Sequence, residues 1–299
     1  MLKLILKIVL FVILVPLVVL FGLFLTAPSG SEFIRKNPNT TALIRQRNEE
    51  YQKTGKKVQI RWQWVQLSQI SPNIIHAVIL AEDVRFYQHN GFDVEAIKFA
   101  LEKNMRRKKY AIGGSTITQQ LAKNLYLSTK KSIPRKIREL ITAFKMERQL
   151  SKKRILELYL NVIEFGNGIY GVEAASQYYF SKSAAKLSID EASRLVSIIP
   201  SPRRHSPYDG SKFTEHRRKW LLSWLYKTAY IDSVQYESLH GEKIENLQAT
   251  IDSISSETPG AAGINQFLLE VDDSLNAELE NPSGDSPLEV QDEAVDRLP

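Results

Sequence analysis

An uncharged run of eighteen residues, Ile8 to Leu25, is the feature that most constrains how this chain can fold. As a helix it is long enough to span the hydrocarbon core of a bilayer. Lys3 and Lys7 precede it and favour an N-terminus on the cytoplasmic side. Pro16 is tolerated in a membrane helix. We therefore expect residues 1–27 to form a cytoplasmic stub and a single transmembrane anchor.

A cleaved signal peptide is the alternative explanation of this run. Its apolar region would usually be shorter, and Pro28 directly after Thr26 and Ala27 is a poor cleavage context. Arg35 and Lys36, on the far side, weaken the charge argument for orientation. The sequence thus favours an uncleaved anchor more strongly than it favours one direction of insertion.

The charge of the chain divides at about residue 246. Residues 246–299 contain twelve Asp or Glu and one Arg, whereas the 245 residues before them contain 39 basic and 21 acidic side chains. We expect the acidic segment to be a largely disordered tail. A basic body suits an anionic partner, either nucleic acid, anionic lipid or a phosphorylated substrate, and the predicted anchor favours the last two. The absence of cysteine excludes disulfides, thiol nucleophiles and cysteine-ligated metals.

Helical periodicity dominates the chain between the anchor and the tail. Residues 28–57 are predicted to be a polar stalk with one helix, and residues 58–245 a mainly α-helical domain. Val58 to Leu67 alternates apolar and polar residues and is the best candidate for a short strand. A helix that starts at a proline is predicted within residues 70–87, with Ile74, Ile75, Val78 and Ile79 at helical spacing. Further helices are predicted at 93–107, 116–126, 134–150, 151–163, 168–180, 188–199, 214–228 and 232–240.

One short segment, Gly113 to Leu125, is unusually rich in hydroxyl and amide side chains. Thr116 with Gln119 three residues later fits a capping box, so a well-capped helix start explains part of it. On a helical wheel, however, Thr116, Gln119, Gln120 and Lys123 share one face opposite the apolar residues. Such a set of donors, acceptors and one cation suits a sugar joined to a phosphate.

Three further segments carry charged side chains in suggestive positions. Glu82 and Asp83 directly follow an apolar helix face, and nearby aromatic residues could hold a carboxylate in a partly apolar wall, which is how a base of useful pKa arises. Arg135 and Glu139 lie one turn apart on a helix, opposite a predicted buried stripe. Lys152 begins a mainly structural helix. Taken singly, each is explained as well by solvated charges or a surface ion pair.

Together these segments resemble the peptidoglycan glycosyltransferases, glycosyltransferase family 51, over about residues 62–239. The resemblance rests on five motifs in order: Glu82-Asp83-x-x-Phe86-x-x-His89-x-Gly91, Gly114 to Gln120, Arg135-Lys136-x-x-Glu139, Lys152-x-x-Ile155-Leu156-x-x-Tyr159-Leu160-Asn161, and Glu191-Ala192-x-Arg194-Leu195 with the following IIPSPRRHSP. The preceding TTALIRQR and RWQWVQLSQIS are similar to the monofunctional, membrane-anchored branch of the family.

The resemblance implies a lysozyme-like helical domain of two lobes, with the smaller lobe dipping into the membrane. It implies polymerisation of lipid II into β-1,4-linked glycan with inversion and release of undecaprenyl diphosphate, on the periplasmic side of the bacterial inner membrane. Its partners would be lipid II, the undecaprenyl-diphosphate-linked glycan and membrane lipids, and other cell-wall synthesis or division proteins are compatible with it; nucleic acid is not expected. A divalent cation, Mg²⁺ or Mn²⁺, is compatible with the chemistry, and no other cofactor is expected.

The resemblance also assigns roles to individual residues. Glu82 is the expected general base and Glu139 the expected residue beside the departing diphosphate, because inversion needs two separated carboxylates. Loop 103–112 is expected to move as substrate enters. The expected substrate-binding residues are Asp83, His89, Ser115, Thr116, Gln119, Gln120, Lys123, Asn124, Lys131, Arg135, Lys136 and Lys152. Arg194, in a segment that the family often fills with apolar residues, is expected to have no catalytic role.

Two other functions compete with this interpretation. A lysozyme-like lytic enzyme would need no diphosphate site and would leave the Gln-Gln-Lys face and the basic cluster unexplained. A non-catalytic cell-wall scaffold would not need both Glu82 and Glu139. Strings resembling transpeptidase motifs occur at 53–55, 128–131 and 274–276, but in the wrong order, so we predict no transpeptidase domain and no covalent labelling by penicillin.

Overall fold

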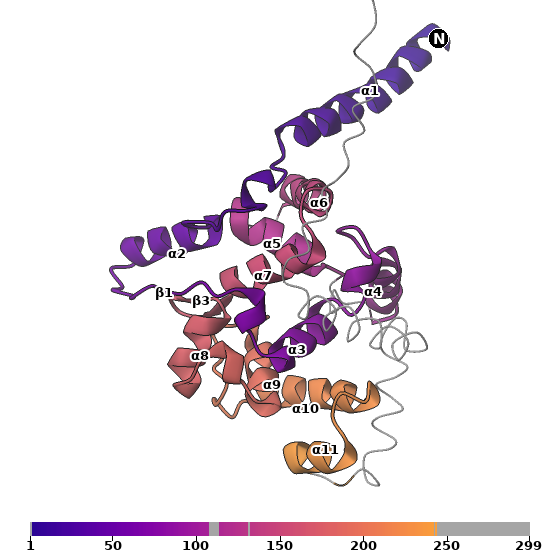
Figure 1. Cartoon of the computed structure of the whole chain (residues 1–299). Helices are drawn as coiled ribbons and strands as arrows, with labels where there is room; N and C mark the ends of the chain where they lie inside the picture. The colour runs from indigo at the N-terminus through magenta and orange to yellow at the C-terminus, as the bar shows by residue number, and fades with distance from the viewer. Residues whose placement is uncertain (1, 108–113, 131, 242, 244–299) are drawn as a thin grey trace, which may run out of the picture.

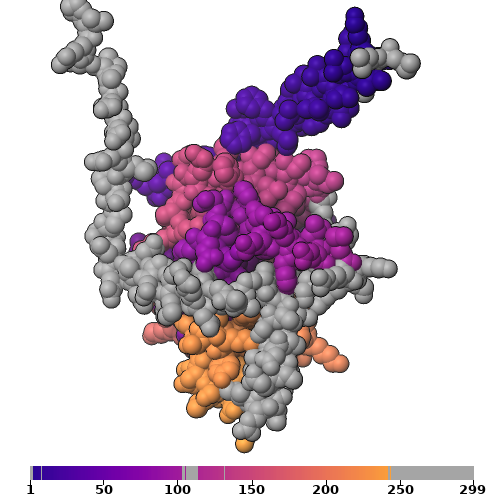
Figure 2. All heavy atoms as spheres, turned by 90° about the vertical axis from the view of Figure 1, so that its right-hand side faces the viewer, coloured from indigo at the N-terminus to yellow at the C-terminus, as the bar shows by residue number. Residues whose placement is uncertain are grey.

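The structure, a computed structural model, describes residues 2–107, 114–130, 132–241 and 243. Helix α1 (Leu2–Thr26) projects from one end of a helical body, and both views show most of its length extending away from that body (Figures 1 and 2). It is long and apolar enough to cross a membrane, as predicted. The predicted tail, 246–299, lies outside the described residues, as do residues 108–112 of the loop expected to move.

The body is mainly α-helical, and most of its helices begin within two residues of the predicted start, except that the helix predicted from 168 begins at Val172. The first part contains α2 (Ala42–Lys53), α3 (Pro72–Glu82), α4 (Val94–Arg107), α5 (Ile117–Tyr126) and α6 (Ile133–Glu147). The second part contains α7 (Lys152–Val162), α8 (Val172–Phe180), α9 (Ile189–Ile198), α10 (Lys212–Lys227) and α11 (Ser233–His240). Hydroxyl side chains cap many of them: Thr116, Ser132 and Ser151 each accept a hydrogen bond from the first turn of their helix.

The hydrophobic core is built around α3 and α7, whose buried residues pack with those of the neighbouring helices. Ile74, Ile75, Val78 and Ile79 of α3 are all buried, which confirms the helical spacing predicted for this segment. Helix α5 packs between α6 and α7, and α9 packs on both α3 and α10 (Figure 1). These contacts fix the C-terminal end of α3 beside α5 and α10, which is where the candidate site lies.

The predicted strand from Val58 to Leu67 is much shorter than expected. Only β1 (Arg61–Trp62) pairs as a strand, in parallel with β3 (Ile169–Tyr170), and β3 pairs antiparallel with β2 (Glu164–Gly166). Beyond Trp62 the side chain of Asn161 replaces a partner strand, because its amide oxygen accepts from the Val65 N–H and its amide nitrogen donates to the Val65 carbonyl. Strands β2 and β3 occupy a stretch predicted to be a turn and a helix start.

The predicted stalk is part of the folded body. Helix α2 packs against α5, and its Leu43, Ile44 and Tyr51 are buried. Arg47 of α2 forms an ion pair with the buried Glu164 of β2, with Nη2 and Oε2 3.1 Å apart. Packing and a buried ion pair therefore hold residues 41–53 against the body.

The prediction that the apolar stripe of α6 (Ile137, Leu140, Ile141 and Phe144) faces the core is wrong. The buried residues of α6 are instead Glu139, Thr142, Ala143 and Met146. Ile137, Leu140, Ile141 and Phe144 are only half-buried, and Ile133 at the start of the helix is 78% exposed. Helix α6 contacts the end of α1, since Lys145 donates to the carbonyls of Phe24 and Ala27 and Arg138 donates to that of Thr26. The half-exposed stripe thus belongs to a helix that lies beside the anchor.

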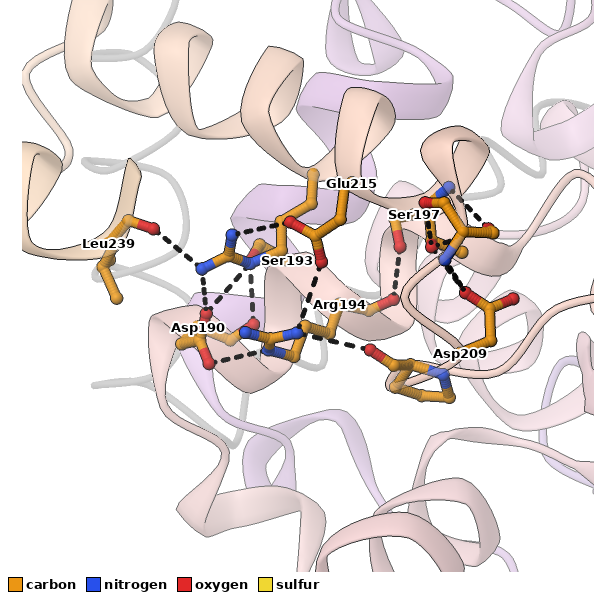
Figure 3. Close-up of polar contacts among 11 residues, drawn as sticks. Asp190, Ser193, Arg194, Ser197, Asp209, Glu215 and Leu239 are labelled. Atoms are coloured by element: carbon orange, nitrogen blue, oxygen red, sulfur yellow. Dashed lines mark hydrogen bonds and ion pairs between the residues drawn. The ribbon is translucent and has the colours of Figure 1, made fainter. Parts of the chain in front are cut away.

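An ion-pair network joins the last helices (Figure 3). Asp190 of α9 accepts from Arg194 at 2.8 Å and from Arg218 at 2.7 Å, and Arg218 also donates to the Leu239 carbonyl of α11. The Arg194 guanidinium lies over the ring of Tyr208. Arg194 therefore has an ion-pair partner and a ring partner, and its lack of a catalytic role stays a prediction.

Candidate active site

Glu82 is the last residue of α3, and its carboxylate is held from two sides. Gln120 of α5 donates its Nε2 to Oε2 at 2.8 Å, and Arg217 of α10 places Nη2 3.6 Å from Oε1. The side chain is 12% exposed. Burial raises the pKa of Glu82, and the Gln120 hydrogen bond, Arg217 and Lys123 oppose that rise. The result is a mostly buried carboxylate with a raised pKa, whereas the aromatic wall suggested by the sequence stays a prediction.

Asp83, the next residue in the chain, joins the end of α3 to the start of α5 through hydrogen bonds. Its Oδ2 accepts from the Ile117 N–H at 2.9 Å, and its Oδ1 lies 2.8 Å from Nε2 of His89. The other ring nitrogen of His89 accepts from the Gly91 N–H. Asp83 and His89 are thus both buried and join the end of α3 to the start of α5, which is a positioning role.

Gly91 allows the closest approach in this region. Its φ is +92°, and a Cβ there would lie 3.1 Å from the backbone carbon and oxygen of Ala143 in α6, so a larger residue would be strained. The Gly91 carbonyl accepts from Thr116 at 2.8 Å and from Nε2 of Gln119 at 3.1 Å. Thr116 also caps α5, but Gln119 points to this carbonyl and does not complete the capping box.

Glu139 differs from Glu82 because cations contact it directly. Arg135 donates to one of its oxygens and Lys136 to the other, each at 2.5 Å, and the Glu139 side chain is 4% exposed. Nζ of Lys136 also donates to Ser115 at 2.7 Å and to Oε1 of Gln119 at 2.8 Å. The pair predicted at spacing i,i+4 is therefore the buried centre of a polar cluster that joins α6 to the start of α5.

Lys123 links the two carboxylates electrostatically. Burial lowers its pKa, while the charges of Glu139 and Glu82 both raise it and those of Arg135 and Lys136 lower it further. The side chain is half-buried on α5, the helix that also carries Gln119 and Gln120. Lys123 therefore lies within the field of both acidic groups and can respond to a charge that develops near either.

Other predicted site residues lie farther from the two carboxylates. Lys152 donates to Glu147 at 2.8 Å and to the His89 carbonyl at 2.6 Å, so buried protein groups already satisfy much of its charge. Asn124 is buried in α5, 7% exposed. Lys131 lies outside the described residues. The structure thus brings together Glu82 and Gln120, and separately Glu139, Arg135, Lys136, Ser115 and Gln119, with Lys123 in the field of both carboxylates.

Two contacts of the site were not predicted from the sequence. Arg217 reaches Glu82 from α10 and donates Nε to the Ser197 carbonyl of α9 at 3.1 Å, although its neighbour Arg218 turns to Asp190. Tyr159, buried in α7, donates to Oε1 of Gln120 at 3.1 Å. The sequence around Arg217 and Tyr159 does not indicate these contacts, because Glu82 and Gln120 are far from them in the chain.

Comparison with known proteins agrees with this geometry. The family model described as Transglycosylase matches residues 47–225, which include both carboxylates and begin within α2. The chain belongs to the transglycosylase family. Its domain is accordingly lysozyme-like and mainly helical, and the protein is an enzyme of the transglycosylase class.

Curated relatives extend the match across most of their own length. The biosynthetic peptidoglycan transglycosylase of Thiobacillus denitrificans is 46% identical over 185 residues, 62% of this chain and 80% of the relative. That of Aromatoleum aromaticum is 45% identical over 192 residues, 64% and 84%. That of Herminiimonas arsenicoxydans is 40% identical over 222 residues, which is 74% of this chain and 96% of the relative.

Proposed function

We propose that this transglycosylase is a monofunctional peptidoglycan glycosyltransferase that polymerises lipid II. The 4-hydroxyl of an incoming lipid II attacks the anomeric carbon of a growing glycan held through undecaprenyl diphosphate. A β-1,4 bond forms with inversion, and the bond from the anomeric carbon to the diphosphate oxygen breaks with its electron pair going to the diphosphate. The observation that carries this proposal is the pair of differently partnered, mostly buried carboxylates, with Lys123 in the field of both.

Glu82 is the proposed general base. Its raised pKa matches a group that must take the proton of the attacking hydroxyl, since a base is most effective when its pKa is near the working pH. Gln120 and Arg217 favour the ionised form that can accept a proton. Glu82 is therefore more basic than an ordinary carboxylate, while the two contacts lower the cost of its ionised form.

The cluster around Glu139 is proposed to face the departing diphosphate. Arg135, Lys136 and Lys123 supply positive charge to stabilise the charge that develops on the leaving group. The buried Nε of Arg135 has no hydrogen-bond partner among the described residues, so one guanidinium donor remains for a ligand oxygen. Glu139 orients the two cations on α6 and assists release.

The Glu139 cluster is already occupied by cationic side chains. Both oxygens of Glu139 accept from Arg135 and Lys136, and the described residues contain no group of three or more His, Asp or Glu able to bind a metal. We therefore propose that Arg135, Lys136 and Lys123 neutralise the leaving group.

Lipid-linked substrates fit the surroundings of α1. The anchor and the half-exposed apolar stripe of α6 lie on adjoining elements, and Ile133, the first residue of α6, is exposed. Since apolar surface of this kind is covered by lipid more favourably than by water, we propose that α6 contacts the bilayer. We further propose that α1 crosses the inner membrane once, with Lys3 in the cytoplasm and the body in the periplasm. We propose that 1–27 is the anchor, that 58–245 is the catalytic domain, to which α2 of segment 28–57 is joined, and that 246–299 is a separate tail.

The decisive experiment incubates the full-length protein in detergent with lipid II and separates the glycan products by size, with and without moenomycin. We expect polymer from the native protein, none from Glu82→Gln, and normal polymer from the matched control Glu49→Gln, an exposed carboxylate on α2. Near-normal synthesis by Glu82→Gln would overturn the assignment. Release of fragments from purified sacculi would instead support a lytic enzyme.

Orientation has a separate test, because the chain contains no cysteine. A single cysteine in place of exposed Lys57 should react with a membrane-impermeant maleimide on intact spheroplasts, whereas one in place of Lys3 should react only after lysis. The reverse labelling pattern would place the body in the cytoplasm, and the proposed reaction on the periplasmic side of the membrane would then be wrong.

A further inference from the structure

We infer that Tyr159 is a positioning residue: its buried hydroxyl sets the orientation of the Gln120 side-chain amide, so that the amide N–H and not the amide oxygen faces Glu82. The inference rests on the proposed role of Glu82 as general base. Tyr159 lies in α7, in a segment whose sequence indicates only a core helix.

The geometry is a chain of two hydrogen bonds across three helices. The Tyr159 hydroxyl donates to Oε1 of Gln120 at 3.1 Å, and Nε2 of the same amide donates to Oε2 of Glu82 at 2.8 Å. Tyr159 is fully buried and Gln120 is partly buried. The core helix α7 therefore contacts the site through one hydroxyl group, by way of α5, to the end of α3.

The direction of these bonds matters because a side-chain amide has two orientations of similar shape. One places its N–H₂ group toward the carboxylate and the other places its oxygen there. An ionised carboxylate accepts hydrogen bonds and repels a carbonyl oxygen, so only the first orientation stabilises the anion. Burial and the nearby charges of Glu82 and Asp83 raise the pKa of Tyr159 well above its usual value, so the hydroxyl keeps the proton it donates.

The hydroxyl matters because it is the donor to the amide oxygen of Gln120. A phenylalanine would fill the same core space but could not donate this hydrogen bond, so the amide would lose one of the two contacts that fix its orientation.

The test is Tyr159→Phe in the full-length protein, with the kcat/KM for lipid II measured from pH 5 to 9. Because the Gln120 bond favours the ionised form of Glu82, weakening it raises the apparent pKa of the acidic limb. One neutral hydrogen bond predicts a rise of about 0.7, hence a loss of about five-fold below the limb and little change above it. Gln120→Ala should move the limb in the same direction.

Two further variants separate positioning from a general loss of structure. Tyr170→Phe is the matched control, because the Tyr170 hydroxyl is also buried but has no hydrogen-bond partner among the described residues. It should leave the pH profile unchanged. Adding Tyr159→Phe to Gln120→Ala should cause no further shift of the limb, since Tyr159 acts through Gln120.

The outcomes are distinguishable. An equal loss of activity at every pH, or a further shift in the Gln120→Ala background, would overturn the positioning role even if Glu82→Gln is inactive. A fully active Glu82→Gln would instead overturn the base assignment of the proposed function. A Tyr159→Phe limb that coincides with that of the native protein would overturn the inference alone.

Discussion

Glu82 and Glu139 are both largely buried, but their surroundings differ in kind. Glu82 has one amide hydrogen bond and a guanidinium at 3.6 Å, so much of its charge is uncompensated and burial raises its pKa. Glu139 has a cation bonded to each oxygen. A carboxylate of the first kind is suited to take up a proton, whereas one of the second kind organises positive charge. The contrast explains how one site can serve both the attacking and the departing group.

The largest expected effect comes from removing each carboxylate. Glu82→Gln should lower the rate of polymerisation by about 10³-fold, since a general base contributes roughly 10²–10⁴. Glu139→Gln should lower it too, but should also reduce lipid II binding because Arg135 and Lys136 lose their common acceptor. Single-turnover rates and binding isotherms measure the two effects. If Glu82→Gln reduced lipid II binding as much as Glu139→Gln does, the proposed difference between the roles of the two carboxylates would be wrong.

Stability should move in opposite directions in the same two variants. A carboxyl group with a raised folded pKa contributes stability that is present at low pH and lost as pH rises through that pKa. Glu82→Gln should therefore raise the unfolding temperature at pH 8 and leave it unchanged at pH 4. Glu139→Gln should lower it at pH 8, because two partly buried cations lose their partner. Thermal unfolding at both pH values tests this, and a destabilised Glu82→Gln at pH 8 would contradict it.

Removing a cation should affect the two carboxylates differently. Arg135→Met leaves Glu139 with one partner and should cost about 3 kcal/mol of unfolding free energy, together with weaker binding of the diphosphate. Arg217→Met should leave stability less changed but raise the pKa of Glu82, so the acidic limb of kcat/KM moves to higher pH and Arg217→Lys partly restores it. Denaturant unfolding and pH profiles measure these effects. If the acidic limb of kcat/KM shifted in Arg135→Met but not in Arg217→Met, Arg135 and not Arg217 would be the cation that sets the pKa of Glu82.

The smallest expected effect is that of Ser115→Ala. Ser115 accepts one of the three hydrogen bonds donated by Lys136, and Gln119 and Glu139 remain as partners. A loss of about one neutral-acceptor hydrogen bond predicts a two- to five-fold weaker apparent affinity for lipid II. Its pH profile should match that of the native protein, and a shift of the Glu82 limb would show that the two halves of the site are coupled more strongly than the structure indicates.

The sequence by itself determined the anchor, the helical body and most helix boundaries. These follow from local chemistry: an uncharged run that suits lipid, hydroxyl caps such as Thr116 and Ser151, and apolar residues at helical spacing in α3. Five ordered motifs also selected Glu82 and Glu139 and placed the chain in the right family. Each of these signals is carried by residues close together in the chain.

Only the tertiary structure decided how those residues are used. The pattern of α6 predicted that its apolar stripe faces the core, yet the structure buries Glu139 and leaves the stripe half-exposed on a helix that contacts the end of α1. A hydrophobic pattern does not distinguish a face covered by protein from one covered by lipid. Asp83 and His89 became supports for α5, and Arg217 and Tyr159 reached the Glu82 site from helices far away in sequence. Burial and long-range partners set the pKa of a carboxylate, and neither is a property of its neighbours in the chain.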